Sequence, residues 1–572
     1  MMPLALDPVL AYTSLSMSTL HIIDAAGQRH AVSIPSSAAG QTVARCVYTS
    51  GLVPAPALCS GLGRCGACRM RFLSEVPLPK GDDALYFSQT ELERGWRLAC
   101  RHAPRNGMIV ELPGAQDAAM SAEHISPAPF PPSGTGLHAP GRLTVAVDMG
   151  TTSLHWSALM DGTRLFSGQM GNPQMGAGSE VMSRLAFARE RDGALTLQRL
   201  MQNGLRDIVA EVSARAEAPV QELCIAGNTV MTCLLLGKNT AGLAAAPYSL
   251  SYRGGTVETL PGLPPCYIPP LPAPFVGADL SAGILAVEND RPAFPYLLAD
   301  MGTNGEFVLA PDADHALVTS VALGPALEGI GLHFGTVASP GAVSRFTLSP
   351  AGLIPHRISG NEPESGSPRY GITGTGYLSL IHALLRCGIL DADGHFTSTP
   401  SSPLGARLNA FLVEFGGEQR FMLPLTPPSV HGQAALSSSF SSLQFPEGTP
   451  YLSAADVEEI LKVKAAFALA CERLLREADL SPADLRAVHL AGALGTHVQP
   501  DDLAALGFFP DSMEPRIQAA GNTSLRGAEL FLIDPTQRAV AERRTAAATP
   551  VDLTTDAAFT QTFVRHMHFA HL

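Results

Sequence analysis

One short pattern occurs twice in the chain: an apolar run ends in Asp-Met-Gly-Thr, and a second apolar run follows it. The first copy is LTVAVDMGTTSLHWSALM at 143–160, and the second is LLADMGTNGEFVLA at 297–310. A strand, turn and strand that recur at distant positions indicate an internal duplication. A second echo, AGNT at 226–229 and again at 520–523, has a strand before it and a helix after it in both places. The sequence therefore predicts two related halves.

Strands and helices alternate over about residues 142–540, which predicts an α/β architecture. The stretch that begins at Ser453 has a serine N-cap, an acidic first turn and apolar residues at helical spacing. We place the first half of this region at 142–294 and the second half at 295–572. The second half includes an insertion around 340–450, and the alternation in its tail, FVRHMHFAHL, predicts a C-terminal strand.

The stretch CSGLGRCGAC at 59–68 spells G-x-G-x-x-G and also contains three cysteines. A dinucleotide loop would follow an apolar strand and open a helix. Here the stretch follows VPAPAL, and the strand-like CRMRFLS continues from its last cysteine. The spacing C-x5-C-x2-C with a distant Cys100 is one residue longer in its first gap than that of plant-type [2Fe–2S] ferredoxins. A zinc ribbon is the weaker alternative, because Cys100 has no close cysteine partner. A loop that wraps a cluster needs positive φ angles, which the glycines supply.

The residues around these cysteines predict a small α+β domain of two short strands, a helix, the cysteine loop and returning strands. This region resembles the β-grasp ferredoxin domain over about residues 18–113. The resemblance implies that the metal ligands are Cys59, Cys65, Cys68 and Cys100. We take 1–113 as this domain, and the Pro-rich stretch 114–141 as an extended tether.

The two Asp-Met-Gly-Thr turns have the chemistry of phosphate loops. Glycine permits a tight hairpin, backbone N–H groups and threonine hydroxyls can bond phosphate oxygens, and the aspartate can hold a metal-bound water. A single copy would most often be an ordinary hairpin turn, but two copies favour a nucleotide site. GPALEG at 324–329 and GITGTG at 371–376 either line the same cleft or form a loop and a helix N-terminus.

Five motifs in order resemble those of the RNase H-like ATPases, the superfamily of sugar kinases, Hsp70 and actin. DMGTTS and DMGTNGE correspond to its two phosphate loops, the AGNT copies to its two connecting segments, and LAGALG at 490–495 to its adenosine loop, with Ala493 in place of a usual glycine. The resemblance implies that Asp148 and Asp300 organise Mg²⁺ through water and that Glu306 positions the hydrolytic water. It implies nucleotide contacts from Gly150, Thr151, Thr152, Gly227, Asn228, Gly302, Thr303, Asn304, Gly492, Gly495, Gly521 and Asn522.

A ferredoxin domain joined to such an ATPase, with NPQMGAGSEVMSRL at 172–185 after the first phosphate loop, resembles the reductive activators of corrinoid proteins. That family implies an ATP-hydrolysing iron–sulfur reductase, in which one electron from a [2Fe–2S] cluster reduces Co(II) to Co(I) in a corrinoid methyltransferase partner. The implied cofactors are the [2Fe–2S] cluster, ATP and Mg²⁺. The implied partners are a corrinoid protein and a low-potential electron donor, and a homodimer through the ATPase domain is one option.

Two alternatives remain open from the sequence: an ATP-dependent activator of another metallocofactor enzyme, and an ATPase that a cluster regulates as a redox sensor. The net charge of −13, without a cluster of basic residues, argues against nucleic acid and anionic membranes as partners. The chain also has no apolar run of about 18 residues and no basic signal-peptide start, so we expect a cytoplasmic protein.

Overall fold

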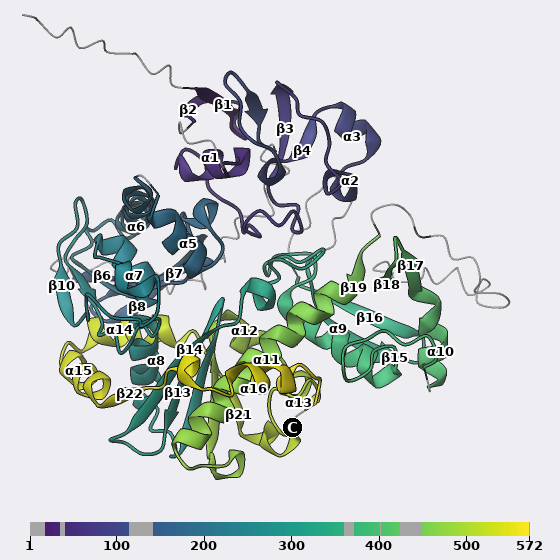
Figure 1. Cartoon of the computed structure of the whole chain (residues 1–572). Helices are drawn as coiled ribbons and strands as arrows, with labels where there is room; N and C mark the ends of the chain where they lie inside the picture. The colour runs from purple at the N-terminus through teal and green to yellow at the C-terminus, as the bar shows by residue number, and fades with distance from the viewer. Residues whose placement is uncertain are drawn as a thin grey trace, which may run out of the picture.

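The computed structural model describes residues 18–34, 40–113, 141–190, 192–359, 371–400, 402–423, 445 and 449–570. Its strands form one five-stranded sheet, two six-stranded sheets and two smaller sheets (Figure 1). Most of the stretch that we predict to be a tether, 114–140, lies outside the described residues. Within the described residues, no helix combines the length and the apolar character that crossing a membrane requires.

The N-terminal domain is built on the five-stranded sheet, whose order is β2-β1-β5-β3-β4. β1 and β5 run parallel and the other pairs are antiparallel. The apolar positions of the strands and of α1 form one core, which confirms the α+β β-grasp prediction. Its elements are β1 (Thr19–Ile23), β2 (Arg29–Ser33), α1 (Val43–Thr49), β3 (Arg69–Ser74), α2 (Asp83–Tyr86), α3 (Gln89–Glu93), β4 (Trp96–Leu98) and β5 (Ile109–Glu111).

The first ATPase-like half has a six-stranded sheet in the order β10-β11-β9-β6-β7-β8. Three antiparallel strands, β6 to β8, are extended on one side by the parallel β9 and β11. The strands are β6 (Leu143–Met149), β7 (Ser153–Met160), β8 (Thr163–Gly171), β9 (Glu222–Gly227), β10 (Thr256–Glu258) and β11 (Cys266–Ile268). The helices are α5 (Val181–Ala188), α6 (Gly193–Ala216), α7 (Thr229–Leu236) and α8 (Ala278–Asn289), and a 3₁₀ turn, η2, spans Met175–Ala177.

The second half repeats this plan in the order β21-β20-β12-β13-β14-β22. Again three antiparallel strands are extended by parallel ones, which confirms the predicted duplication. Its strands are β12 (Tyr296–Met301), β13 (Asn304–Ala310), β14 (Ala316–Ala322), β20 (Ala487–Ala491), β21 (Ile517–Gly521) and β22 (Ala548–Pro550). Its helices include α11 (Ala454–Glu477), α12 (Gly492–His497), α13 (Pro500–Ala505), α14 (Thr523–Ile533) and α15 (Gln537–Ala547). The Ser453 hydroxyl accepts from the Asp456 backbone N–H, so the predicted N-cap of α11 is confirmed.

The two AGNT copies do not occupy equivalent places, which corrects the pairing that the sequence predicts. The first copy ends β9, the strand directly beside β6. The second copy ends β21, which is separated from β12 by β20. In this arrangement β20 corresponds to β9, so α8, which follows β11, is the counterpart of α14. A four-residue motif is too short to report which strand of a sheet it follows.

Helices α8 and α14 cross closely and link the two halves. A Cβ on Gly527 of α14 would lie 2.0 Å from the Ala282 carbonyl oxygen of α8, so only glycine permits this approach. The α14 side chains also reach the first sheet: Ala528 and Phe531 join a core cluster with Ala146 and Tyr267. The last part of the chain thus completes the hydrophobic packing of the first half.

The region of the predicted insertion contains β15 (Val343–Ser349), β16 (Gly352–Arg357), α9 (Gly374–Cys387), α10 (Pro403–Leu408), β17 (Leu412–Phe415) and β18 (Glu418–Met422). β15 and β16 form a two-stranded sheet, while β17 and β18 form a three-stranded sheet with β19 (Tyr451–Ser453). These strands lie to the side of the two large sheets (Figure 1). Residues 360–370 and 424–444 lie outside the described part, and the exact bounds of the insertion stay a prediction.

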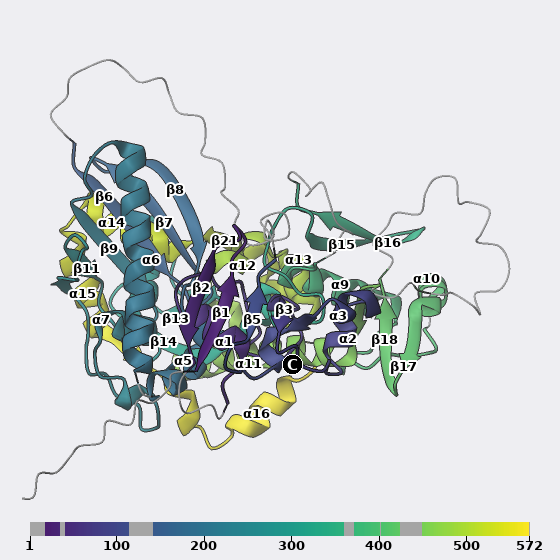
Figure 2. The ribbon, with the colours of Figure 1, turned by 90° about the horizontal axis from the view of Figure 1, so that it is seen from above.

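The predicted strand in the tail is wrong, because residues Phe559–His566 form a helix, α16, that lies beside α11 (Figure 2). Phe559, Phe563 and Met567 are spaced by four residues and pack against the core of the second half. Spacing by four places side chains on one face of a helix. This contact outweighs the local alternation of histidines and apolar residues that favours a strand.

We predict that Gly527→Ala destabilises the protein although alanine is the better helix former. The gain in helix propensity is about 1 kcal/mol, but overpacking at the backbone contact with Ala282 costs about 1–3 kcal/mol. Differential scanning calorimetry should show a melting temperature lower by about 2–4 °C. Gly81→Ala is the control, since a Cβ at this position would have no other atom within 4 Å; an equal effect of both changes would contradict the explanation.

Candidate functional site

The cysteine loop, residues 59–68, connects α1 to β3 and bends at its glycines. Gly61, Gly63 and Gly66 have φ angles of +88°, +76° and +67°, as the prediction of positive φ angles requires. At Gly66 the backbone approaches Tyr86 so closely that a Cβ would lie 2.7 Å from its ring. These angles and this contact explain why glycine recurs here without a dinucleotide-binding role.

The four predicted cysteine ligands come together as two pairs. The Cys59 and Cys65 thiols interact with each other, and so do the Cys68 and Cys100 thiols. The Cys65 thiol and backbone N–H groups of the loop lower the pKa of Cys59 to about 5, despite its burial. The Cys68 thiol lowers the pKa of Cys100 as well, whereas contact with the partner thiol and burial hold the pKa of Cys65 and Cys68 well above the usual range. One thiol of each pair therefore favours the thiolate that binds metal, and two cysteine pairs suit a site with two metal atoms that each take two thiolates.

The two Asp-Met-Gly-Thr loops are tight hairpins, one in each half. Gly150, Thr151 and Thr152 connect β6 to β7, and Gly302 and Thr303 connect β12 to β13. A Cβ on Gly150 would lie 2.6 Å from the Ser153 carbonyl oxygen, so this turn requires glycine.

Asp300 lies opposite Glu306 in the antiparallel pair of β12 and β13. Asn304 is the first residue of β13. The hairpin therefore brings together both acids that the resemblance assigns to this loop.

The AGNT asparagines cross from one half to the other. Asn522, the N-cap of α14 in the second half, donates through Nδ2 to Oδ2 of Asp148 at 2.7 Å. Asn228, the N-cap of α7 in the first half, donates through Nδ2 to Oε1 of Glu306 at 3.2 Å. Ser524 adds a hydrogen bond from its hydroxyl to Oδ1 of Asp148 at 2.8 Å. Each half thus holds an acid of the other half.

Several carboxyl groups meet where these loops converge, and their pKa values are raised. Burial, followed by the charges of Asp148 and Asp279, raises the pKa of Asp300 to about 8. Burial, with the charge of Asp148 as a further cause, raises the pKa of Asp279 to about 7. Burial and the neighbouring aspartates hold the pKa of Glu306 well above its usual range. Carboxylates crowded in this way attract a divalent cation, because such cations prefer oxygen ligands. The charge of the bound cation would lower the raised pKa values again.

Threonine hydroxyls from both phosphate loops face each other. Oγ1 of Thr152 and Oγ1 of Thr303 are 3.1 Å apart, and the Thr303 hydroxyl donates to Oε1 of Glu328 at 2.7 Å. Glu328 ends a 3₁₀ turn, η4 (Pro325–Glu328), within GPALEG. GPALEG is therefore part of the site. Glu328 accepts a hydrogen bond from the same Thr303 hydroxyl that the family resemblance assigns to phosphate.

Side chains of the stretch NPQMGAGSEVMSRL donate hydrogen bonds to the backbone of the first phosphate loop. Asn172 donates through Nδ2 to the Gly150 carbonyl oxygen at 2.7 Å. Arg184 is fully buried and donates to the Thr151 carbonyl oxygen and, at 2.9 Å, to the Gly178 carbonyl oxygen. A buried guanidinium that donates to backbone carbonyls fixes their positions.

The predicted adenosine loop begins where β20 meets the second phosphate loop. Gly492 has φ +83°, and a Cβ there would lie 2.6 Å from Oδ1 of Asp300. Gly495 packs against the Leu490 backbone, where a Cβ would lie 2.7 Å from the carbonyl carbon. LAGALG therefore adjoins Asp300, whereas Gly227 and Gly521 end β9 and β21.

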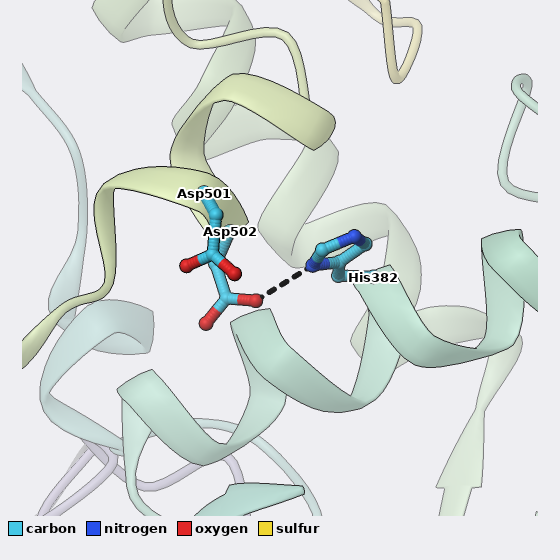
Figure 3. A group of neighbouring side chains, drawn as sticks. All are labelled: His382, Asp501 and Asp502. Atoms are coloured by element: carbon cyan, nitrogen blue, oxygen red, sulfur yellow. Dashed lines mark hydrogen bonds and ion pairs between the residues drawn. The ribbon is translucent and has the colours of Figure 1, made fainter. Parts of the chain in front are cut away.

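A histidine and two aspartates lie beyond the adenosine loop (Figure 3). His382 of α9 and Asp502 of α13 are joined by a hydrogen bond of 2.7 Å between Nδ1 and Oδ1, and the neighbouring Asp501 is exposed. The group ties α9, which starts in GITGTG, to α13, which follows LAGALG. We explain it as packing between two helices.

Three of the residues that carry this geometry are missed by the sequence. Asp279, in the first turn of α8, and Ser524, in α14, lack a motif. Asp279 comes near Asp148 because the start of α8 packs against the end of β9, beside Asp148, and Ser524 comes near it because α14 packs across from the second half. Glu328 lies in a motif that predicts a loop as readily as a cleft. For Arg184, the motif is visible in the sequence, but its burial is not.

Family models account for most of the chain. The model of the RACo middle region matches residues 143–291, and that of the C-terminal domain of RACo, the ASKHA domain, matches 295–415 and 442–572. The chain belongs to the RACo family. A third model, the 2Fe-2S iron-sulfur cluster binding domain, matches residues 27–105, which contain all four paired cysteines. A RACo-type ATPase region and an iron–sulfur domain therefore share this chain.

Individual relatives agree with the RACo assignment. The corrinoid activation enzyme RamQ of Eubacterium limosum is 26% identical over 447 residues, which cover 74% of this chain and 70% of RamQ. The [Co(II) methylated amine-specific corrinoid protein] reductase of Methanosarcina barkeri is 26% identical over 285 residues, 47% of this chain and 44% of that protein. The solved structure of a reductive activator for corrinoid,iron-sulfur protein is 21% identical and covers 96% of this chain and 98% of its own, with a TM-score of 0.63. This similarity establishes a shared fold.

We predict that Asp300→Asn makes the protein less sensitive to rising pH when divalent cations are chelated. Asp300 has a pKa of about 8 in the folded protein and about 3.9 in an unfolded chain. Between these values the unfolded state binds fewer protons, so the free energy of unfolding falls as the pH rises. Melting temperatures between pH 5 and 8 should fall less in the variant, by about 2–4 °C at pH 8.

Asp312→Asn serves as the control for this pH profile. The Asp312 carboxylate is exposed, and its hydrogen bond to His315 lowers its pKa. Its replacement should therefore leave the decline between pH 5 and 8 unchanged. Parallel curves for the wild type and Asp300→Asn would show that Asp300 does not gain a proton on folding.

Proposed function

We propose that this protein is an ATP-dependent reductive activator, which uses ATP and one electron to return an inactive Co(II) corrinoid protein to the Co(I) state. The observation that carries the proposal is the presence, in one chain of the RACo family, of a two-pair cysteine loop and a doubled phosphate loop. The names of the relatives that act on corrinoid proteins support the choice of partner. We also propose that a low-potential electron donor reduces the protein and that two copies of the chain pair through the ATPase region.

The cysteine loop is the proposed holder of a [2Fe–2S] cluster, with Cys59 and Cys65 on one iron and Cys68 and Cys100 on the other. When bound, such a cluster supplies a one-electron carrier with a reduction potential near −400 mV. The chain contributes the thiolates and the backbone N–H groups that the glycine turns direct at Cys59. Hydrogen bonds to ligand sulfurs are among the features that tune the potential of such a site.

ATP is proposed to bind between the two hairpins with its phosphates at Thr151, Thr152, Thr303 and Asn304. Asp148 and Asp300 would hold Mg²⁺ through water, and the convergence of raised-pKa carboxyl groups supports a cation at this point. Glu306, held by Asn228, is placed to orient an attacking water. Gly150, Gly227, Gly302, Gly492, Gly495 and Gly521 would allow the backbone to approach the nucleotide. Asn522 would contact it as well and also bonds Asp148.

The need for ATP follows from the redox chemistry. For one electron, each ~59 mV by which the donor potential is too high reduces the equilibrium constant tenfold. A carrier without an energy source cannot overcome a large deficit. A nucleotide that favours one arrangement of the protein over another can supply the missing free energy through its differential affinity for the two arrangements.

We predict that the cluster needs the paired cysteines and no other thiol. Cys65→Ser and Cys100→Ser should each abolish the paramagnetic signal that a reduced [2Fe–2S] cluster gives in electron paramagnetic resonance. Cys46→Ser is the control, because Cys46 is buried in α1 and its thiol contacts the Gln41 side chain. A full signal from either loop variant would reject that cysteine as a ligand.

We predict that Co(I) appears only when reductant, ATP and intact aspartates are all present. The assay mixes the full-length protein anaerobically with a Co(II) corrinoid protein and follows Co(I) absorbance. Asp148→Asn and Asp300→Asn should lower both ATP hydrolysis and Co(I) formation about 100-fold, since a cation is worth several kcal/mol to phosphate chemistry. Asp312→Asn should retain both activities. Absence of Co(I) with the wild type would reject the proposal, and ATP hydrolysis that responds to cluster reduction in that case would favour a redox sensor.

A further inference from the structure

One side of the cysteine loop lies against the ATPase region. Cys59 packs in an apolar cluster with Met175 and Ile330, and all three are nearly fully buried. The Ser60 hydroxyl lies 2.6 Å from the Ser179 hydroxyl and accepts a hydrogen bond from the Ser179 backbone N–H at 2.7 Å. We call the contact of Cys59 and Ser60 with Met175, Ser179 and Ile330 the docking interface.

Helix α1 of the ferredoxin domain extends the docking interface along the first half. A Cβ on Gly176 of η2 would lie 2.6 Å from Cβ of Tyr48, so the two backbones are as close as they can be. Arg45 stacks on Phe187, with its guanidinium carbon 4.5 Å from the ring centre, and pairs with Glu190. In Figure 1 the purple ferredoxin domain accordingly lies beside α5 and α6 of the first half.

Both ATPase segments of the docking interface also contact the phosphate loops. Ser179 adjoins Gly178, whose carbonyl oxygen accepts from Arg184, and Arg184 also donates to the Thr151 carbonyl oxygen. Ile330 follows Glu328 by two residues, and Glu328 accepts from the Thr303 hydroxyl. Only a few residues therefore separate each phosphate loop from the surface under the cysteine loop.

Glu328 occupies the place where a phosphate group would compete with it. Its Oε1 accepts a hydrogen bond from the Thr303 hydroxyl at 2.7 Å, the same hydrogen bond that a phosphate oxygen at the second loop would accept. Its Oε2 is buried and has no hydrogen-bond partner among the described residues. The Thr152 hydroxyl, the Thr303 backbone and the charge of Arg184 also stabilise this carboxylate. The unpaired Oε2 nevertheless leaves part of its burial cost uncompensated, and the negative charge of a phosphate next to it would repel it.

We propose that Glu328 is a latch that phosphate displaces, so that nucleotide binding at the second phosphate loop releases the ferredoxin domain from the docking interface. Movement of Glu328 carries the end of η4 and Ile330 with it, and thus removes one side of the apolar cluster that contains Cys59. Because linkage is reciprocal, the docked ferredoxin domain lowers the affinity for nucleotide by the same factor. The latch rests on the proposed ATP site and adds to it a means of exposing the cysteine loop to a partner.

The test uses the full-length protein with its cluster loaded, the non-hydrolysable analogue AMPPNP with Mg²⁺, and no corrinoid protein. Glu328→Ala removes the competitor for the Thr303 hydroxyl, so it should bind AMPPNP about tenfold more tightly in calorimetry. In the wild type, AMPPNP should speed hydrogen exchange of residues 43–51 and 59–68. In Glu328→Ala, AMPPNP should leave the hydrogen exchange of residues 43–51 and 59–68 unchanged. Glu472→Ala is the control, since Glu472 pairs with Arg565 and His566, and it should behave as the wild type.

A second variant tests the same linkage from the ferredoxin side. Gly176→Ala should push Tyr48 away, speed exchange of 43–51 without nucleotide, and tighten AMPPNP binding, whereas Gly81→Ala should do neither. Weaker or unchanged AMPPNP binding by Glu328→Ala would overturn the latch, as would unchanged affinity in an undocked Gly176→Ala. Because these readouts need no cobalt, a working latch without Co(I) formation would reject only the proposed function, and the converse would reject only the latch.

Discussion

The exchange of hydrogen bonds between the two halves is the interaction on which the rest of the structure depends. Carboxyl groups from both halves converge in one region, where water alone does not solvate them fully. Asn522 of the second half satisfies Asp148 of the first, and Asn228 of the first half satisfies Glu306 of the second. Acids removed from water need such partners, so each half stabilises an acid of the other. The close crossing of α8 and α14 brings the partners within reach.

The same arrangement explains why a polyanion and a cation suit this place together. Raised pKa values mean that the carboxyl groups there hold protons more firmly than they would in water. A divalent ion would replace those protons, and its charge would in turn attract phosphate. The hairpin threonines and Asn304 add neutral donors that suit phosphate oxygens. Burying several carboxylates together is unfavourable in the protein alone, and it becomes favourable when the cation and the phosphate are both bound.

Local chemistry decides how much of this could be predicted from the sequence. The cysteine loop and the two hairpins were predictable, because glycine turns, thiols and a short Asp-Met-Gly-Thr unit carry their geometry within a few residues. The equivalence of the two AGNT copies was predicted wrongly, because sheet order depends on which distant strands pair. Asp279 was missed because its closeness to Asp148 depends on how the start of α8 packs at the end of β9. The tail is a helix because its aromatic residues contact a core that alternation cannot reveal.

The packing of α14 and α15 on the first sheet also bears on how the protein is made. Ala528, Phe531 and Ala541 fill the core that begins with Ala146 in β6, almost four hundred residues earlier in the chain. A ribosome releases β6 long before it releases those helices, and nascent domains generally fold in the order of synthesis. Helix α8 covers part of the apolar face of the first sheet early, and the part under α14 and α15 stays uncovered until those helices are made. Helices from late in the chain, rather than from the first half itself, therefore complete the core of the first sheet.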